Sequence, residues 1–132
     1  AYKPGKKVVM EIEGKPINLG GKQAFTDNTT GRVIVPLRET ARALGADLQG
    51  FQLKRSEWQE DMDLRDNYGL ASMGPKVKSY LNILLGQKQW RVYLTLETEQ
   101  DNMISIDELA FALGYNPIWD EENSRLNLIK MQ

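Results

Sequence analysis

The fold is decided by the segment RVIVPLRETARALGA, residues 32–46. Its first part, residues 33–35, is a run of β-branched side chains, which favours a strand. Pro36 then stands where a helix can begin, because the N–H that proline lacks has no partner in a first helical turn. The segment therefore predicts a strand that leads directly into a helix.

The helical part of this segment has one apolar face and a defined end. Apolar side chains recur three and four positions apart, which is the spacing of one helix face: Leu37, Ala41 and Leu44. Gly45 follows, and glycine readily adopts the left-handed conformation that ends a helix. Residues 48–53 supply the next predicted strand.

The same order of elements recurs near the end of the chain. After a short extended stretch, a second helix is expected to begin at a capping box formed by Ser105 and Glu108 and to end at Gly114. Its apolar stripe consists of Ile106, Leu109, Ala110 and Leu113. Aligning Gly45 with Gly114 shifts the chain by 69 residues and gives five identities. We interpret the segments as degenerate strand-helix-Gly-strand repeats and expect them to share one sheet.

Further strands are indicated by alternation of apolar and polar residues or by β-rich apolar runs: residues 8–12, 80–85, 90–96, 118–119 and 125–130. Turn-forming residues at 13–16 and 86–88 predict hairpins. The predicted fold class is α+β, with a small antiparallel β-sheet wrapped around helices.

The chain is expected to form a single domain. We predict that residues 1–7 are an N-terminal tail, that residues 8–132 are the domain, and that the densely charged residues at about 54–75 are an insertion. At 132 residues, one domain with its own core is the expected size.

Composition excludes several chemistries. The chain has no histidine and no cysteine, which excludes thiolate zinc sites, cysteine nucleophiles and Ser-His-Asp triads. Its 17 basic and 18 acidic residues give a net charge of −1, so no nucleic-acid partner is expected. The apolar runs are shorter than a membrane span, so no membrane insertion is expected.

Two stretches resemble a known family, residues 33–46 and residues 113–120, which read LGYNPIWD. They are similar to the copper amine oxidase N-terminal-like domain, also called the stalk domain, whose members read roughly yVPLRxxAexLGaxVxWD, often twice. The second copy departs from this pattern by having SIDE at 105–108 in place of PLRE. The first copy has Gly50 and Phe51 in place of the Trp-Asp pair.

This resemblance implies a small α+β module in secreted or surface-attached bacterial proteins. The copper chemistry of the family belongs to another domain, so no catalytic residue, cofactor or metal ligand is carried over. The expected function is that of a non-catalytic extracellular or cell-surface stalk, spacer or protein-interaction domain, and not of an enzyme. Its expected partner is a protein or an adjacent module.

The alternative function is a cell-wall or carbohydrate-binding module that contacts polysaccharide through exposed aromatic side chains. An aromatic ring can cover the apolar face of a sugar, and the candidates are Trp58, Trp90, Trp119, Tyr80 and Tyr93. Trp58 lies in the charged insertion and is the candidate for ligand contact. Trp119 is expected in the core, and Trp90 and Tyr93 are expected on opposite faces of one strand.

Carboxylates suggest a third hypothesis, a small carboxylate-dependent hydrolase. Glu39 and Glu108 occupy the same place in the two repeats and are the candidate acid-base pair, although a negative charge in a first helical turn has a structural explanation. Arg38 is a candidate for an anion site or a structural ion pair. The acidic runs at 60–63 and 120–123 carry oxygen ligands for calcium, but their spacing is that of solvated turns.

Overall fold

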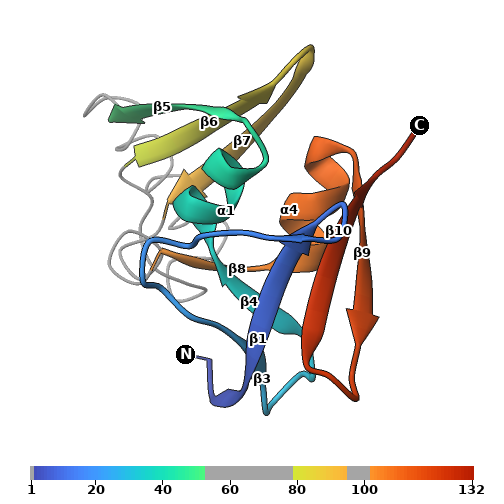
Figure 1. The fold of residues 1–132 in the computed structure, drawn as a ribbon. Helices are drawn as coiled ribbons and strands as arrows, with labels where there is room; N and C mark the ends of the chain where they lie inside the picture. The colour runs from blue at the N-terminus through green and yellow to red at the C-terminus, as the bar shows by residue number, and fades with distance from the viewer. Residues whose placement is uncertain (1, 53–78, 95–101) are drawn as a thin grey trace.

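The computed structural model describes residues 2–52, 79–94 and 102–132. In these ranges two helices lie between two sheets (Figure 1). The elements, in chain order, are β1 (Pro4–Ile12), β2 (Lys15–Pro16), β3 (Ala24–Asp27), β4 (Val33–Pro36), α1 (Leu37–Ala43), β5 (Asp47–Gln52), β6 (Ser79–Leu85), β7 (Lys88–Leu94), β8 (Met103–Ser105), α4 (Ile106–Leu113), β9 (Tyr115–Asp120) and β10 (Arg125–Lys130).

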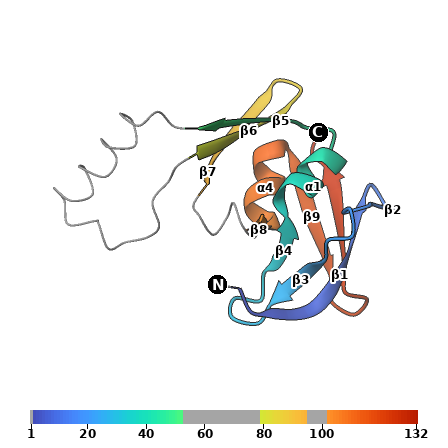
Figure 2. The ribbon, with the colours of Figure 1, turned by 90° about the vertical axis from the view of Figure 1, so that its left-hand side faces the viewer.

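The larger sheet has seven strands and curls around the helices. Its order is β8-β4-β3-β1-β10-β9, with β2 paired to β1, and the β1–β10 pair is its one parallel pair in the described residues. The smaller sheet is antiparallel, has the order β5-β6-β7, and lies on the other side of the helices (Figure 2). The predicted α+β class, with an antiparallel-rich sheet wrapped around helices, is confirmed.

Both predicted repeats are present, as β4–α1–β5 and β8–α4–β9. The predicted glycine lies at the end of each helix: Gly114 is the C-cap of α4, and Gly45 follows Leu44, the C-cap of α1. Both glycines have the positive φ that L-residues rarely adopt, +86° at Gly45 and +83° at Gly114. A strand follows directly in both cases, because the left-handed glycine turns the chain back along the helix. The repeat is therefore structural as well as sequential.

The two repeats meet where β4 pairs with β8. Val35 lies directly opposite Ile104, and these two residues are equivalent at the repeat shift of 69. A local two-fold axis therefore passes between them. The flanking pairs exchange under this symmetry: Ile34 with Ser105, and Pro36 with Met103.

The expectation that both repeats share one sheet is wrong for one strand. β4, β8 and β9 belong to the larger sheet, but β5 belongs to the smaller one. The two repeats differ in the third strand that joins each antiparallel pair. β10, the hairpin partner of β9, pairs with the N-terminal strand β1, whereas β6, the antiparallel partner of β5, pairs with β7.

The core is formed by the apolar stripes of both helices together with the inner faces of both sheets. The two predicted helix stripes are buried, with Leu37, Ala41, Leu109 and Ala110 fully inaccessible. Side chains from the smaller and the larger sheet join the same cluster: Leu81, Ile83, Leu126 and Leu128. In the described residues, neither helix is long and apolar enough to cross a bilayer.

The N-terminal tail is shorter than expected. β1 begins at Pro4, so residues 4–7 of the predicted tail are strand. The reason is pairing with β3: Pro4 lies opposite Asp27 and Lys7 opposite Phe25. The Lys3 N–H also donates a hydrogen bond to Asp27 Oδ1 at 2.9 Å, which fixes the chain just before the strand.

The capping box predicted at the start of α4 does not form. Ser105 is the N-cap residue, but its side chain makes no capping hydrogen bond, and its Oγ is buried without a partner. The equivalent residue of the first repeat, Pro36, has no hydroxyl and almost the same backbone angles. In both repeats the turn from strand to helix thus forms without a capping hydrogen bond from the side chain of the N-cap residue itself.

The burial pattern of α4 predicts that two of its residues contribute very differently to the free energy of unfolding. Leu113→Ala should lower the free energy of unfolding by about 2–5 kcal/mol, because it removes a fully packed side chain and leaves a cavity. Phe111→Ala, at a residue that is 59% exposed, should change it by less than about 0.5 kcal/mol. Urea denaturation measures both, and equal effects would contradict the helix orientation.

The hydrogen bonds of Asp27 predict that this residue contributes to the loss of folding stability at acidic pH. Hydrogen bonds from the Lys3 N–H, the Thr30 hydroxyl and the Thr29 N–H lower the pKa of Asp27 and outweigh the opposing effect of burial. Because the folded pKa lies below the unfolded pKa of about 3.9, this stabilisation is complete above the unfolded value and disappears as the pH falls through the folded one. Asp27→Asn should therefore lose less stability than the parent chain between about pH 5 and pH 2 in urea titrations. Equal losses in both proteins would show that Asp27 does not contribute.

Candidate functional site

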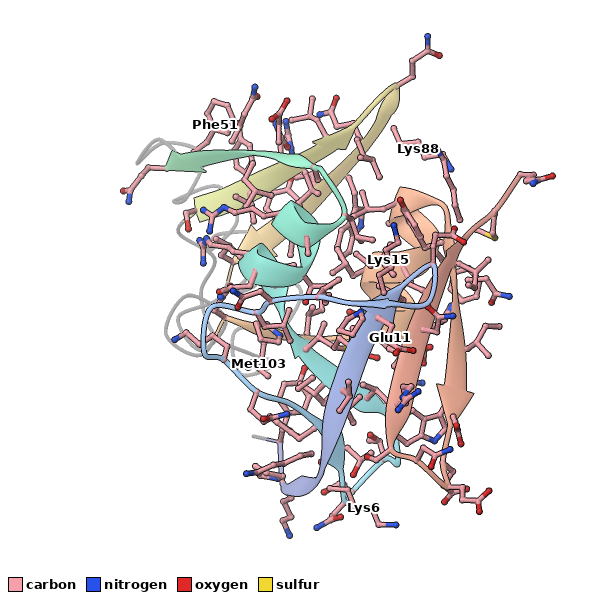
Figure 3. The ribbon with its side chains drawn as sticks, viewed as in Figure 1. Lys6, Glu11, Lys15, Phe51, Lys88 and Met103 are labelled. Atoms are coloured by element: carbon pink, nitrogen blue, oxygen red, sulfur yellow. The ribbon has the colours of Figure 1, made fainter. Side chains whose placement is uncertain are left out.

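The smaller sheet has two unlike faces. Its inner face packs on the helices and carries the buried residues Leu81, Ile83 and Leu94. The side chains of the opposite face alternate with these and point away from the helices, as Figure 3 shows for Phe51. We call this opposite surface the outer face, and its members are Asp47, Gln49, Phe51, Tyr80, Asn82, Leu84, Gln89, Arg91 and Tyr93.

An aromatic row crosses the outer face. Phe51 lies opposite Tyr80 in the β5–β6 pair, and Tyr80 lies opposite Tyr93 in the β6–β7 pair. The Phe51 and Tyr80 rings stack with their centroids 5.1 Å apart and 20° between planes, and the Tyr80 and Tyr93 centroids are 6.0 Å apart at 58°. Phe51 is 41% exposed and Tyr93 is 53% exposed. The row therefore ends in two rings that are open to solvent.

A polar row lies beside the aromatic one and consists of Gln49, Asn82 and Arg91. The Arg91 Nε donates a hydrogen bond to Asn82 Oδ1 at 3.0 Å. The Arg91 guanidinium carbon lies 4.1 Å from the centroid of the Tyr80 ring, which is a cation–π contact. The outer face thus combines aromatic rings with amide and guanidinium groups.

The second repeat shows that the fold does not require this aromatic row. The repeat shift of 69 places Asp120 at the position of Phe51. Arg125 lies opposite Asp120, as Tyr80 lies opposite Phe51, and Val9 of β1 follows on the next strand. An acid, a base and a valine occupy the row that is aromatic in the first repeat. Framework packing alone therefore does not explain the aromatic residues.

The structure brings together two of the five aromatic candidates, Tyr80 and Tyr93. Trp90 is partly buried against the core, on the other side of β7 from Tyr93, which confirms that the two residues have opposite orientations. Trp119 packs against the core as predicted. Trp58 and the acidic run at 60–63 lie outside the described residues.

Sequence reasoning missed Phe51 and Arg91 as members of the site. Phe51 was visible as a departure from the family pattern, and the alternation of β5 places it on the solvent side. Arg91 has the same parity as Tyr93 on one strand, which places both side chains on one face. The first signal places Phe51 on the outer face, and the second places Arg91 there because Tyr93 is exposed.

The Glu39 carboxylate is engaged in a structural interaction. Asn102 Nδ2 donates to Glu39 Oε1 at 2.5 Å and to Oε2 at 3.1 Å. Asn102 Oδ1 accepts hydrogen bonds from the Arg38 N–H and Nη1, each at 3.3 Å, and the Asn102 carbonyl accepts one from the Leu37 N–H at 2.7 Å. Asn102 therefore caps the N-terminus of α1, and Arg38 and Glu39 belong to this cap.

Glu108, the other candidate carboxylate, interacts electrostatically with Tyr2. The pKa of Tyr2 is raised, first by burial and then by the negative charges of Glu108 and Asp27.

In the acidic run at 120–123, both Asp120 oxygens accept hydrogen bonds from Asn123, which lower the pKa of Asp120. In the part of the chain that the structure describes, no group of three or more acidic side chains is arranged to hold a metal ion.

Comparison with protein-family models, with characterised proteins and with solved structures finds no significant match. The similarity to the stalk domain therefore stays a prediction that depends on residues 33–46 and 113–120.

The cap on α1 predicts a measurable contribution from Asn102. Asn102→Ala removes the side-chain acceptor of the Arg38 N–H and the partner of Glu39, and it should lower the free energy of unfolding by about 0.5–2 kcal/mol. Asn116→Ala, at an exposed residue of β9, is the control and should have almost no effect. Urea denaturation compares the two variants, and an unchanged Asn102→Ala protein would contradict the capping role.

Proposed function

We propose that this chain is a non-catalytic module of a bacterial secreted or cell-surface protein. In this proposal the two repeats form a rigid stalk or spacer, and the outer face of β5–β6–β7 binds carbohydrate. The observation that carries the proposal is the aromatic row, which the equivalent surface of the second repeat lacks.

The chemistry of the outer face suits a sugar chain. The exposed rings of Phe51 and Tyr93 can cover the apolar faces of pyranose rings. Gln49 and Gln89 are exposed amides on the same face, and each offers donors and an acceptor for sugar hydroxyls. An aromatic surface with interspersed hydrogen-bonding groups matches the alternation of apolar and polar surface on a saccharide.

Other functions are less well supported. A single-stranded nucleic acid also stacks on aromatic rings, but it needs a positively charged track, whereas the outer face carries Arg91 together with the acidic Asp47 and the chain has a net charge of −1. A hydrolase needs a free carboxylate pair, whereas Glu39 is bound by Asn102. A protein partner is an alternative occupant that the binding assay tests.

The proposal predicts binding to polysaccharide that depends on the ends of the aromatic row. Native gels that contain soluble glucans, xylans or uronic acid polymers, together with depletion assays on peptidoglycan, should show retention of the full chain by at least one polymer. Phe51→Ala and Tyr93→Ala should each weaken this retention about tenfold, which corresponds to the stacking of one ring. Phe111→Ala is the matched control, because it removes an exposed aromatic ring from α4, outside the outer face.

Two outcomes would contradict the proposal. Failure of every polysaccharide to retain the chain, or equal retention of all three variants, would remove the carbohydrate function and leave a protein partner for the outer face. Turnover of a glycoside or peptide substrate that is lost in Glu39→Gln would show that the module is catalytic. Thermal unfolding of each variant establishes that lost retention is not lost folding.

A further inference from the structure

We infer that the outer face selects an acidic polysaccharide, whose carboxylate binds Arg91 while a sugar ring stacks on Tyr93. This inference rests on the carbohydrate-binding function proposed above and names the class of ligand. The ligand in question is a chain that contains uronic acid or similarly carboxylated sugar residues.

Arg91 is held in place before any ligand arrives. Its Nε is bonded to Asn82 Oδ1, and its guanidinium plane is supported by the Tyr80 ring. Within residues 2–52, 79–94 and 102–132, the hydrogen bond of Arg91 uses Nε and not the two terminal nitrogens, and no carboxylate of these residues lies in ion-pair range of the guanidinium. A fixed planar fork of this kind matches the two oxygens of a carboxylate and loses little side-chain entropy when it binds.

Tyr93 lies next to this fork. Arg91 and Tyr93 are two residues apart on β7, so their side chains leave the same face of the strand about 7 Å from each other. The Tyr93 ring is 53% exposed and is the outermost ring on the Arg91 side of the aromatic row. One carboxylated sugar can therefore place its ring on Tyr93 and direct its charge toward Arg91.

The outer face carries one basic side chain, Arg91, and so offers a site for one carboxylate of the chain at a time. Asp47, the one acidic side chain of this face, lies two strands away on β5 and in another row. The ammonium of Lys88 does not add to the outer face, because it lies against Gly114 at the end of α4 (Figure 3). A nucleic acid would require several such cations in line.

The second repeat again serves as an internal comparison. Asn82 lies opposite Gln49 on one side and opposite Arg91 on the other. The repeat shift places Ile118 at the position of Gln49, and Ile118 lies opposite Asn127, which in turn lies opposite Glu11 of β1. The position that carries the guanidinium in the first sheet therefore carries a carboxylate in the second, 3.8 Å from Arg125. The positive charge at Arg91 is not dictated by the framework.

The test compares one polymer in two charge states. Polygalacturonate and its fully methyl-esterified form have the same sugar rings, but the ester has no negative charge. In native gels and in titration calorimetry, the full chain should bind the acid form at least about tenfold more tightly than the ester. This preference should decline as sodium chloride is added.

Variants assign the preference to Arg91. Arg91→Gln should reduce binding of the acid form to the level of the ester, and Arg91→Lys, which keeps the charge but loses the fork, should be intermediate. Arg125→Gln is the matched control, since Arg125 is an arginine on the equivalent surface of the second repeat, and it should retain the preference. Thermal unfolding shows whether each variant is folded.

Three outcomes would overturn the inference. Equal binding of acid and ester would refute acid selection while leaving the carbohydrate function in place. Binding of neither form, with retention by a neutral polysaccharide in the earlier panel, would do the same. Equally tight binding of a single-stranded oligothymidylate that is lost in Arg91→Gln would assign the site to nucleic acid and would also remove the proposed function.

Discussion

The rest of the structure depends on the pairing of β4 with β8. Val35 and Ile104 are buried and lie opposite each other on a local two-fold axis, and both helices start at the ends of these two strands. Because each strand passes directly into its helix, the register of this single pair sets the positions of α1 and α4. The core that the two helices share then follows from their apolar stripes.

The departure from this symmetry creates the candidate site. In the second repeat, β1 joins the β9–β10 hairpin and draws it into the larger sheet. In the first repeat, β7 joins β5 and β6 and forms a separate sheet with one face turned away from the core. The symmetric framework thus carries two similar surfaces, and only the one without the β1 partner has an aromatic row in the described residues.

Local pattern predicted most of the framework and about half of the site. The positions of Gly45 and Gly114 and the leucine spacing of both helices determine those elements locally, so they were readable in the sequence. Tyr80 and Tyr93 are equidistant from the two-residue turn of Gly86 and Gln87, so their pairing follows from a local hairpin. The contact of Phe51 with Tyr80 was not, because residues 53–78 separate β5 from β6 and no local rule sets the register across such a connection. The sequence pattern also predicted a capping hydrogen bond from the Ser105 hydroxyl that the structure lacks, because Ser105 is placed by its pairing with Ile34.

Gly114 has a consequence that extends beyond its own helix. It needs a positive φ to end α4, and a Cβ at this position would overlap the ammonium of Lys88, which reaches across from the β6–β7 hairpin. No basic residue occupies the last turn of α4, so Lys88 supplies the positive charge that the carboxyl end of the helix favours. Gly114, which ends the helix of the second repeat, therefore also leaves room for the Lys88 side chain of the β6–β7 hairpin.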